Sequence, residues 1–297
     1  MQLKSLSKLV LSLGAVGVLA ACDPAATGGD DATSDNGASE ATTGTINVVS
    51  REDGSGTRGA FTEITGVLED DVDNTYVEAV IQNGTEGVIS TVSQDVNAIG
   101  YISLGSLNDN VKGVAIDGVE PTSETVQNNS FPIARNFNIA WGGDLEAVAQ
   151  DFVDFIMSAE GQELALEEGY VEAVVDAPAY EGDGSQTGTI AVVGSTSVTP
   201  LMEVLSEEYR ALNPEVQIDI TSNGSSAGMT SAIDGTADIG MASRELKDEE
   251  KAELTSQAIA VDGIAVVVNK NNGIEGLTLE QVKQIFTGEV TNWEDLQ

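Results

Sequence analysis

Short apolar runs, glycine-rich loops and amphipathic stretches follow one another in a repeated order along the chain. Residues 45–50 form a strand-like run that ends in a loop at 51–57, and a helix is predicted to begin near Arg58. The same order of strand, loop and helix recurs at 189–212 and again at 216–233. In the second of these, a proline follows the loop where the first turn of a helix tolerates it. The repetition predicts an α/β protein.

Two longer stretches and one interruption complete this pattern. Residues 145–166 place apolar side chains on one helical face, and 258–268 are an almost continuous apolar run suited to a buried strand. Residues 176–188 are rich in Pro, Gly, Asp and Ser and show the apolar periodicity of neither a helix nor a strand. We therefore expect a linker there between two structured halves, 44–175 and 189–297.

The first 22 residues have the pattern of a lipoprotein signal peptide. Two lysines precede an apolar run at 9–19, and small residues then lead to Cys22. The run is about half the roughly 20 residues that a spanning helix needs. We expect cleavage and lipidation at Cys22, which is the only cysteine, so no disulfide is expected. Residues 23–43, polar and without aromatic side chains, are predicted to be a flexible tether.

Charge and composition exclude several kinds of function. The formal charge is −37, from 12 basic and 49 acidic residues, which excludes nucleic acid as a partner and indicates a solvated acidic surface. The chain has no histidine, so the commonest zinc sites and a Ser-His-Asp triad are excluded as well. We expect neither a metal nor a cofactor.

The three loops offer the chemistry of anion binding. Each stands where a helix is predicted to begin, and a helix start presents unpaired N–H groups and the positive end of the helix dipole. Arg51 adds a planar guanidinium that can bind an oxyanion with two hydrogen bonds. Hydroxyls in the same loops add uncharged donors; they belong to Ser55, Thr57, Ser197, Thr199 and Ser225.

One of these loops also matches a catalytic motif. Residues 224–228 read Gly-Ser-Ser-Ala-Gly, which is the G-x-S-x-G of a hydrolase elbow. A chain without histidine cannot build the usual triad around Ser226, so an anchored serine phosphatase or esterase is an alternative and not the leading interpretation. No Gly-Lys-Ser or Gly-Lys-Thr follows the glycines, so the loops are not a nucleotide P-loop.

Several stretches together carry a resemblance to a known family. The chain closely resembles the phosphate-binding protein of the phosphate ABC transporter, a periplasmic-type solute-binding protein, and the resemblance covers nearly all of residues 44–297. The stretches that carry it are 51–57, 97–101, 194–199, 224–228, 234–240 and 286–293.

The resemblance implies an α/β, two-lobe periplasmic-binding-protein fold of type II, with the ligand cleft between the lobes. In that family the half that contains 194–199 comes first, whereas here it comes second, so the chain looks circularly permuted. One lobe would comprise 44–133 and 270–297. The other would comprise 134–269, with 176–188 as the link between the original termini.

The resemblance also implies a set of ligand-binding residues. Asp53 would orient Arg51 from the second shell, and Arg244 could add a cation there. Many family members have an aspartate where this chain has Ser243, so a phosphate-selective proton acceptor is missing although the hydroxyl can still bind ligand. The residues expected to bind phosphate are Arg51, Ser55, Gly56, Thr57, Ser197, Val198 through its N–H, Thr199, Ser225 and Ser243.

The function implied is that of a transport receptor and not an enzyme. The protein would be a monomer, lipid-anchored through Cys22 on the outer face of the cell membrane. It would bind inorganic phosphate and deliver it to the permease of an ABC transporter when its lobes close. A surface sensor that binds an oxyanion without any transporter is a further alternative.

Overall fold

The computed structural model describes residues 42–296. The predicted signal peptide, Cys22 and nearly all of the predicted tether lie outside the described residues. Across the described part of the chain, every helix is too short or too polar to cross a membrane.

Strands and helices alternate along the chain. The strands are β1 (Asn47–Arg51), β2 (Leu68–Glu69), β3 (Val72–Asp73), β4 (Val80–Gln82), β5 (Ala98–Ser103), β6 (Val111–Gly113), β7 (Ala115–Ile116), β8 (Ala134–Trp141), β9 (Val171–Glu172), β10 (Thr187–Gly194), β11 (Glu215–Ser222), β12 (Ile239–Ala242), β13 (Thr255–Asn269) and β14 (Gly276–Leu277). The helices are α1 (Gly56–Thr65), α2 (Gly84–Gln94), α3 (Ser123–Gln127), α4 (Ala147–Ile156), α5 (Ala159–Glu167), α6 (Thr199–Leu212), α7 (Ser225–Ile233), α8 (Asp248–Glu253) and α9 (Leu279–Thr287). Short 3₁₀ segments lie at Leu104–Ser106 and Trp293–Leu296.

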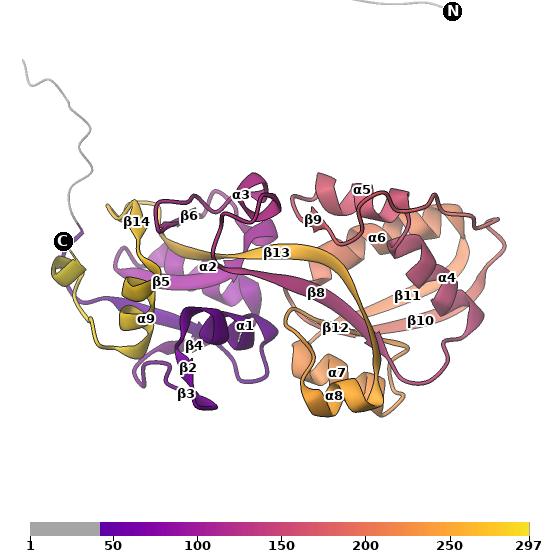
Figure 1. Ribbon diagram of the computed structural model, residues 1–297, viewed down its shortest axis with the longest axis horizontal. Coiled ribbons are helices and arrows are strands. Elements are labelled where there is room, and N and C mark those ends of the chain that lie inside the picture. The colour runs from indigo at the N-terminus through magenta and orange to yellow at the C-terminus, as the bar shows by residue number, and fades with distance from the viewer. Residues whose placement is uncertain (1–41, 297) are drawn as a thin grey trace, which may run out of the picture. The chain divides into compact units, whose positions relative to one another are not determined.

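Ten strands form one mixed sheet, and two of them connect its halves. Eight strands lie in the order β11-β10-β12-β8-β13-β5-β1-β4, while β6 and β9 pair with β13 outside this path. The long strand β13 is antiparallel to β8 over residues 255–263 and to β5 over residues 264–268. β8 and β13 run side by side between the two halves (Figure 1).

The change of partners in β13 divides the chain into two lobes. Lobe A contains residues 42–133 and 264–296, and lobe B contains 134–263. β13 changes partners between 263 and 264, whereas the expected limit lies at 269. The expected division into domains stays a prediction. The fold is the mixed α/β fold that the sequence pattern predicts.

The two ends of the described chain lie against each other in lobe A. The N–H of Trp293 donates to the carbonyl of Gly44 at 3.0 Å, and the N–H of Ile46 donates to the carbonyl of Thr291 at 2.8 Å. Adjacent ends are what a circular permutation requires. The permutation itself stays a prediction.

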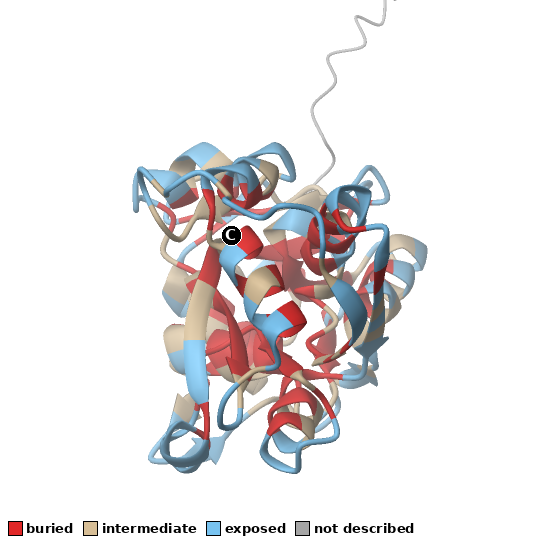
Figure 2. Cartoon of the chain, turned by 90° about the vertical axis from the view of Figure 1, so that its right-hand side faces the viewer, coloured by how far each residue is buried: buried red, intermediate tan, exposed pale blue. Residues whose placement is uncertain are grey.

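A buried aromatic cluster in lobe A supports the end of β1. The rings of Phe61 and Tyr101 stack with their centroids 3.9 Å apart, and Phe286 packs against both by its edge. The hydroxyl of Tyr101 accepts a hydrogen bond from the backbone N–H of Arg51. The core therefore fixes the position of Arg51, and Figure 2 shows how buried residues concentrate on the strands inside the fold.

Local sequence determines where the helices begin. Ser55 caps α1 by accepting a hydrogen bond from the N–H of Arg58, and Pro200 lies in the first turn of α6. The helical stretch predicted at 145–166 is helical but not continuous. The structure has α4 and α5 instead, because Ser158 ends one with a bond to a carbonyl and caps the other with a bond from Gly161.

A buried ion pair joins the two connecting strands. Arg135 on β8 lies opposite Asp262 on β13, and its Nη2 is 3.0 Å from the Asp262 carboxylate. Ser103 donates a further hydrogen bond to this carboxylate, and Arg135 also donates to the carbonyl of Ser243 at 2.9 Å. Burial raises the pKa of Asp262 above its usual value even though Arg135 and Ser103 hold the charged form. Burying this ion pair costs free energy, and the cost is offset only while both charges and their hydrogen-bond partners are present.

We expect Arg135→Met to lower the free energy of unfolding by about 3–5 kcal/mol, because it leaves Asp262 buried without its cation. The measurement is equilibrium unfolding in urea. Arg135→Met with Asp262→Leu should recover much of the loss, and Lys112→Met, which removes an exposed pair with Glu275, should stay close to wild type. A single Arg135→Met variant as stable as wild type would contradict this account.

Candidate functional site

The start of α1 presents lobe A's donors to the cleft between the lobes. Ser55, Gly56 and Thr57 are all buried, and the loop before them places Arg51 at the end of β1. Within residues 42–296, the N–H groups of Gly56 and Thr57 donate to no protein acceptor. Two buried donors at a helix start need an acceptor, and an anion is the natural one.

Lobe B faces this helix with a second set of donors. Ser197 lies just before α6, Ser225 begins α7, and Ser243 follows β12, and all three are fully buried. The N–H of Ser243 donates to the Ser225 hydroxyl at 3.1 Å, and the Ser195 hydroxyl donates to that of Ser243 at 2.8 Å. The result is a dense cluster of hydroxyls at the starts of two helices.

Direct contacts join the two sets across the cleft. The hydroxyls of Thr57 and Ser197 are 2.8 Å apart, and the N–H of Ser226 donates to the carbonyl of Gly54 at 3.1 Å. The predicted residues Ser55, Gly56, Thr57, Ser197, Ser225 and Ser243 are therefore brought together, although they come from segments far apart in the sequence.

Gly56 is where the two lobes approach most closely. A Cβ at this position would lie 2.3 Å from the Ser225 hydroxyl and 2.8 Å from the Ser243 hydroxyl. No side chain fits between the lobes at this distance. Glycine is required here by space, and this lets its backbone N–H reach the hydroxyl cluster.

Arg51 supplies the cation of the site. Only 1% of its surface is exposed. Its Nε and Nη2 each donate to Glu52 at 2.7 Å, and Nη2 also donates to the hydroxyl of Thr196 in lobe B at 2.9 Å. Its Nη1 is buried and has no hydrogen-bond partner among the described residues. A buried guanidinium nitrogen without an acceptor is well suited to bind an anion.

The carboxylate that orients Arg51 is Glu52 and not Asp53. Asp53 is exposed and accepts a bond only from the N–H of Gly54, whereas both oxygens of Glu52 contact the guanidinium. Burial of Glu52 acts to raise its pKa, but the hydrogen bonds and the charge of Arg51 outweigh burial and hold the pKa below its usual value. Glu52 is therefore charged at neutral pH.

The remaining predicted residues make hydrogen bonds to other partners in lobe B. Val198 and Thr199 both direct their N–H groups to the carbonyl of Ser195, and the Thr199 hydroxyl also contacts Ser222 at the edge of the cluster. Arg244 is buried and contacts the hydroxyl of Ser226 at 3.4 Å, but its guanidinium is held by the Glu250 carboxylate at 2.7 Å. Arg244 is thus neutralised within lobe B.

Sequence reasoning missed several residues that border this site. They are Glu52, Thr85, Arg135, Ser195 and Thr196. Ser195 and Thr196 belong to a loop already recognised, and Glu52 is adjacent to Arg51. Thr85 follows a strand and a glycine, which is the same signal as in the other three loops. Nothing local distinguishes Arg135, because its partner is 127 residues away.

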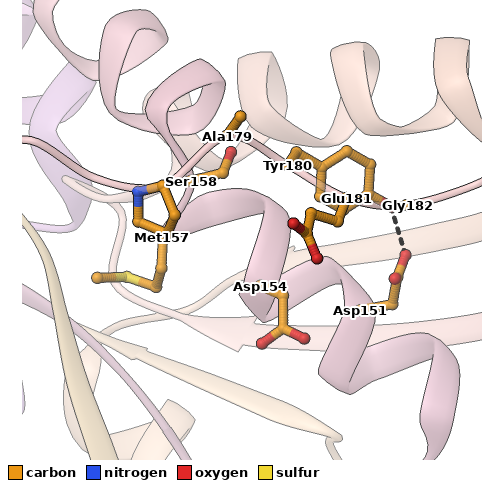
Figure 3. Close-up of a pocket in the computed structure, with 9 residues that line it drawn as sticks. Asp151, Asp154, Met157, Ser158, Ala179, Tyr180, Glu181 and Gly182 are labelled. Atoms are coloured by element: carbon orange, nitrogen blue, oxygen red, sulfur yellow. Dashed lines mark hydrogen bonds between the residues drawn. The ribbon is translucent and has the colours of Figure 1, made fainter.

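A separate hollow of about 490 Å³ lies between α4 and the predicted linker (Figure 3). Its wall includes Asp151, whose carboxylate accepts bonds from the hydroxyls of Tyr180 at 2.5 Å and Tyr209 at 2.7 Å. Burial and the bond to Asp151 raise the pKa of Tyr180 to about 12, so its hydroxyl stays protonated at neutral pH. These contacts fasten the linker to lobe B, and Arg51 and the hydroxyl cluster are not part of this hollow.

The groups gathered at this site are mainly hydrogen-bond donors. Ser226, the central residue of the G-x-S-x-G sequence, contacts Arg244 through its hydroxyl and the carbonyl of Gly54 through its N–H. Among residues 42–296 its hydroxyl has no carboxylate or other general base within hydrogen-bonding distance. Hydroxyls, N–H groups and one guanidinium instead surround a position suited to a tetrahedral oxyanion.

Fold and site together are those of a solute-binding protein. A family profile described as a PBP superfamily domain matches residues 31–160 and 179–297. The chain is 49% identical to phosphate-binding protein PstS 2 of Streptococcus pneumoniae over 98% of this chain and 99% of that one. It is 45% identical to PstS 2 of Streptococcus agalactiae over 99% and 98%.

A solved structure gives the same result. A crystal structure of a phosphate-binding protein of a phosphate ABC transporter from Streptococcus pneumoniae is 52% identical, with a TM-score of 0.70. It covers 86% of this chain and 100% of that one. The chain therefore belongs to the PBP superfamily and, within it, to the family of PstS phosphate-binding proteins, as the sequence motifs predicted.

We expect Gly56→Ala to weaken oxyanion binding by at least tenfold, because the added methyl group would overlap the Ser225 hydroxyl and hold the lobes apart. Isothermal titration calorimetry with phosphate measures the change. Gly118→Ala is the matched control for a loop glycine, since a Cβ there meets nothing within 4 Å, although its positive φ will cost some stability. Unchanged binding by Gly56→Ala would show that the close approach of the lobes is not needed.

Proposed function

We propose that this protein binds inorganic phosphate between its two lobes and delivers it to the permease of an ABC transporter. The observation that carries the proposal is the guanidinium of Arg51, which is buried, is held by Glu52 on one side and has one nitrogen without a protein acceptor. It lies with the hydroxyls and helix starts of both lobes. The names of the relatives, which are phosphate-binding proteins, support the same ligand.

The expected ligand set combines one charge with many dipoles. Arg51 would bind with its unpartnered nitrogen, and Gly56 and Thr57 would donate their N–H groups. Ser197 and Ser225 would donate hydroxyls from lobe B, the first with the N-terminus of α6 and the second with that of α7 behind it. Such donors act on a charged ligand with about twice the strength of neutral hydrogen bonds.

Binding and closure are coupled in this proposal because the donors come from both lobes. Phosphate held by only one lobe would lose half of its hydrogen bonds, so the ligand favours the arrangement in which Thr57 and Ser197 meet. β8 and β13 connect the lobes and would flex as the cleft opens and closes. The permease would recognise the closed form.

The strong negative charge of the protein does not prevent anion binding. Most acidic side chains are on the surface, where salt screens their charge within about 10 Å. Inside the cleft, the anion would meet oriented N–H groups and Arg51 in a site from which water is largely removed. The nearby donors therefore make the electrostatic interaction with the anion favourable.

Ser243 gives the site a hydroxyl where an acceptor for the phosphate proton is expected. Its Oγ accepts from Ser195 and is 3.4 Å from the Ser225 hydroxyl. A hydroxyl can accept a hydrogen bond from the ligand or donate one to it, whereas a carboxylate can only accept one. Ser243 would thus bind phosphate in either ionisation state and would not repel a fully ionised oxyanion.

The cellular setting completes the proposal. The signal peptide would direct the chain across the membrane before its removal, and the lipid on Cys22 would then hold the protein, as a monomer, on the outer face of the membrane. The protein would not be an enzyme, since Ser226 has no base beside it in the described part of the chain. A sensor without a transporter is the alternative, and phosphate uptake by cells that lack this protein distinguishes the two.

We expect the wild type to bind phosphate in calorimetry and Arg51→Met to bind at least about 30-fold more weakly, because loss of a buried charged partner costs about 2–5 kcal/mol. Arg51→Lys keeps the charge but loses the planar fork, and its affinity should lie between the two. Arg210→Met, which removes an exposed arginine, is the control. A wild type that binds no phosphate would refute the proposed function.

A further inference from the structure

The start of α2 is a fourth place at the cleft where a strand is followed by a glycine and then by a helix. β4 ends at Gln82, and α2 begins at Gly84, whose φ of 72° lies in the left-handed region that favours glycine. Thr85 follows and is only 5% exposed. Its hydroxyl is 3.4 Å from that of Ser197 in lobe B.

Arg51 and its partner fix the position of this helix start. β1 and β4 are parallel neighbours in which Arg51 lies opposite Gln82. The Glu52 oxygen that accepts from Nε of Arg51 at 2.7 Å also accepts from the N–H of Gly84 at 3.1 Å. One carboxylate therefore holds both the guanidinium and the first turn of α2, which places Thr85 beside the oxyanion donors.

The protein satisfies the polar groups of Thr85 poorly. A hydroxyl pair normally lies about 2.7–2.8 Å apart, so the 3.4 Å contact with Ser197 is a weak one. In residues 42–296 the N–H of Thr85 has no protein acceptor. Buried polar groups nearly always have partners, so a second acceptor is expected near Thr85.

Thr85 is also close to residues that contact the expected donors. Together with Thr196, Thr199 and Ser222 it lines a hollow of about 280 Å³ between the starts of α2 and α6, and Thr196 accepts a hydrogen bond from Arg51. The hydroxyl of Ser197 contacts both that of Thr57 and that of Thr85. A tetrahedral anion bound to Ser197 would therefore have Thr85 among its neighbours.

We propose that Thr85 is a further phosphate ligand, which donates its hydroxyl, and that the first turn of α2 adds a fourth helix start to the site. The proposal rests on the proposed function, since it assumes that phosphate binds at Arg51. The rival explanation is structural: Thr85 would only join the closed lobes through Ser197.

The test compares phosphate binding by the wild type, Thr85→Val, Thr85→Ser and Thr91→Val in calorimetry. Thr91 is a half-buried threonine on the same helix whose hydroxyl donates to the carbonyl of Gly87, so it controls for loss of a hydroxyl from α2. We expect Thr85→Val to weaken binding about tenfold or more, since the lost bond goes to a charged ligand. Thr85→Ser should bind within about threefold of wild type, and Thr91→Val should match it.

Thermal unfolding with and without phosphate separates a ligand from a structural contact. If Thr85 binds phosphate, the rise in Tm on adding phosphate shrinks in Thr85→Val and returns in Thr85→Ser. Thr85→Val with wild-type affinity, or with a full rise in Tm, would overturn the inference while Arg51→Met still reported on the proposed function. A wild type that does not bind phosphate would overturn both. If Thr85→Val does not fold, Thr85→Ala replaces it with the same expected outcomes.

Discussion

One buried guanidinium organises the cleft. Arg51 is placed at the end of a central strand, where the hydroxyl of Tyr101 accepts from its backbone and the Glu52 carboxylate holds two of its nitrogens. A charge at such depth needs acceptors all around it, and the described residues offer none to Nη1. The incompletely paired cation, with the helix starts around it, makes the cleft selective for an anion in a protein whose formal charge is −37.

A buried charged pair also lies on the strands that connect the lobes. Arg135 and Asp262 face each other on β8 and β13, and Arg135 also reaches the carbonyl of Ser243 in the hydroxyl cluster. The ion pair thus couples the position of the connecting strands to that of a residue at the site. Arg244 shows the contrasting case, because Glu250 neutralises it fully and removes it from the set of available cations.

Sequence patterns predicted most of the fold for physical reasons that are local. The strands before the glycine loops, the helix starts after them and the apolar run in β13 all carry their signal within a few residues. The break between α4 and α5 was missed because one serine, Ser158, outweighs a continuous helical face. The short strands β6, β7 and β9 exist only through their tertiary partners, so no pattern in their own residues indicates them.

Site residues that belong to a local sequence motif could be predicted. Contacts between residues far apart in the sequence could not. Arg51, Thr57, Ser197 and Ser225 were found from loops at helix starts, and the structure brings them together. The choice between Glu52 and Asp53 depends on which of two adjacent carboxylates faces inward at the end of a strand, and composition cannot decide this. Contacts such as Arg51 with Thr196, 145 residues away, appear only when the two lobes meet.

The most direct measurement is a crystal structure of the protein grown with phosphate. The account predicts one anion between the lobes, bonded to Nη1 of Arg51, to the N–H groups of Gly56 and Thr57 and to the hydroxyls of Ser197 and Ser225. Phosphate bound elsewhere, for example in the hollow beside Tyr180, with no anion at Arg51, would contradict the central claim.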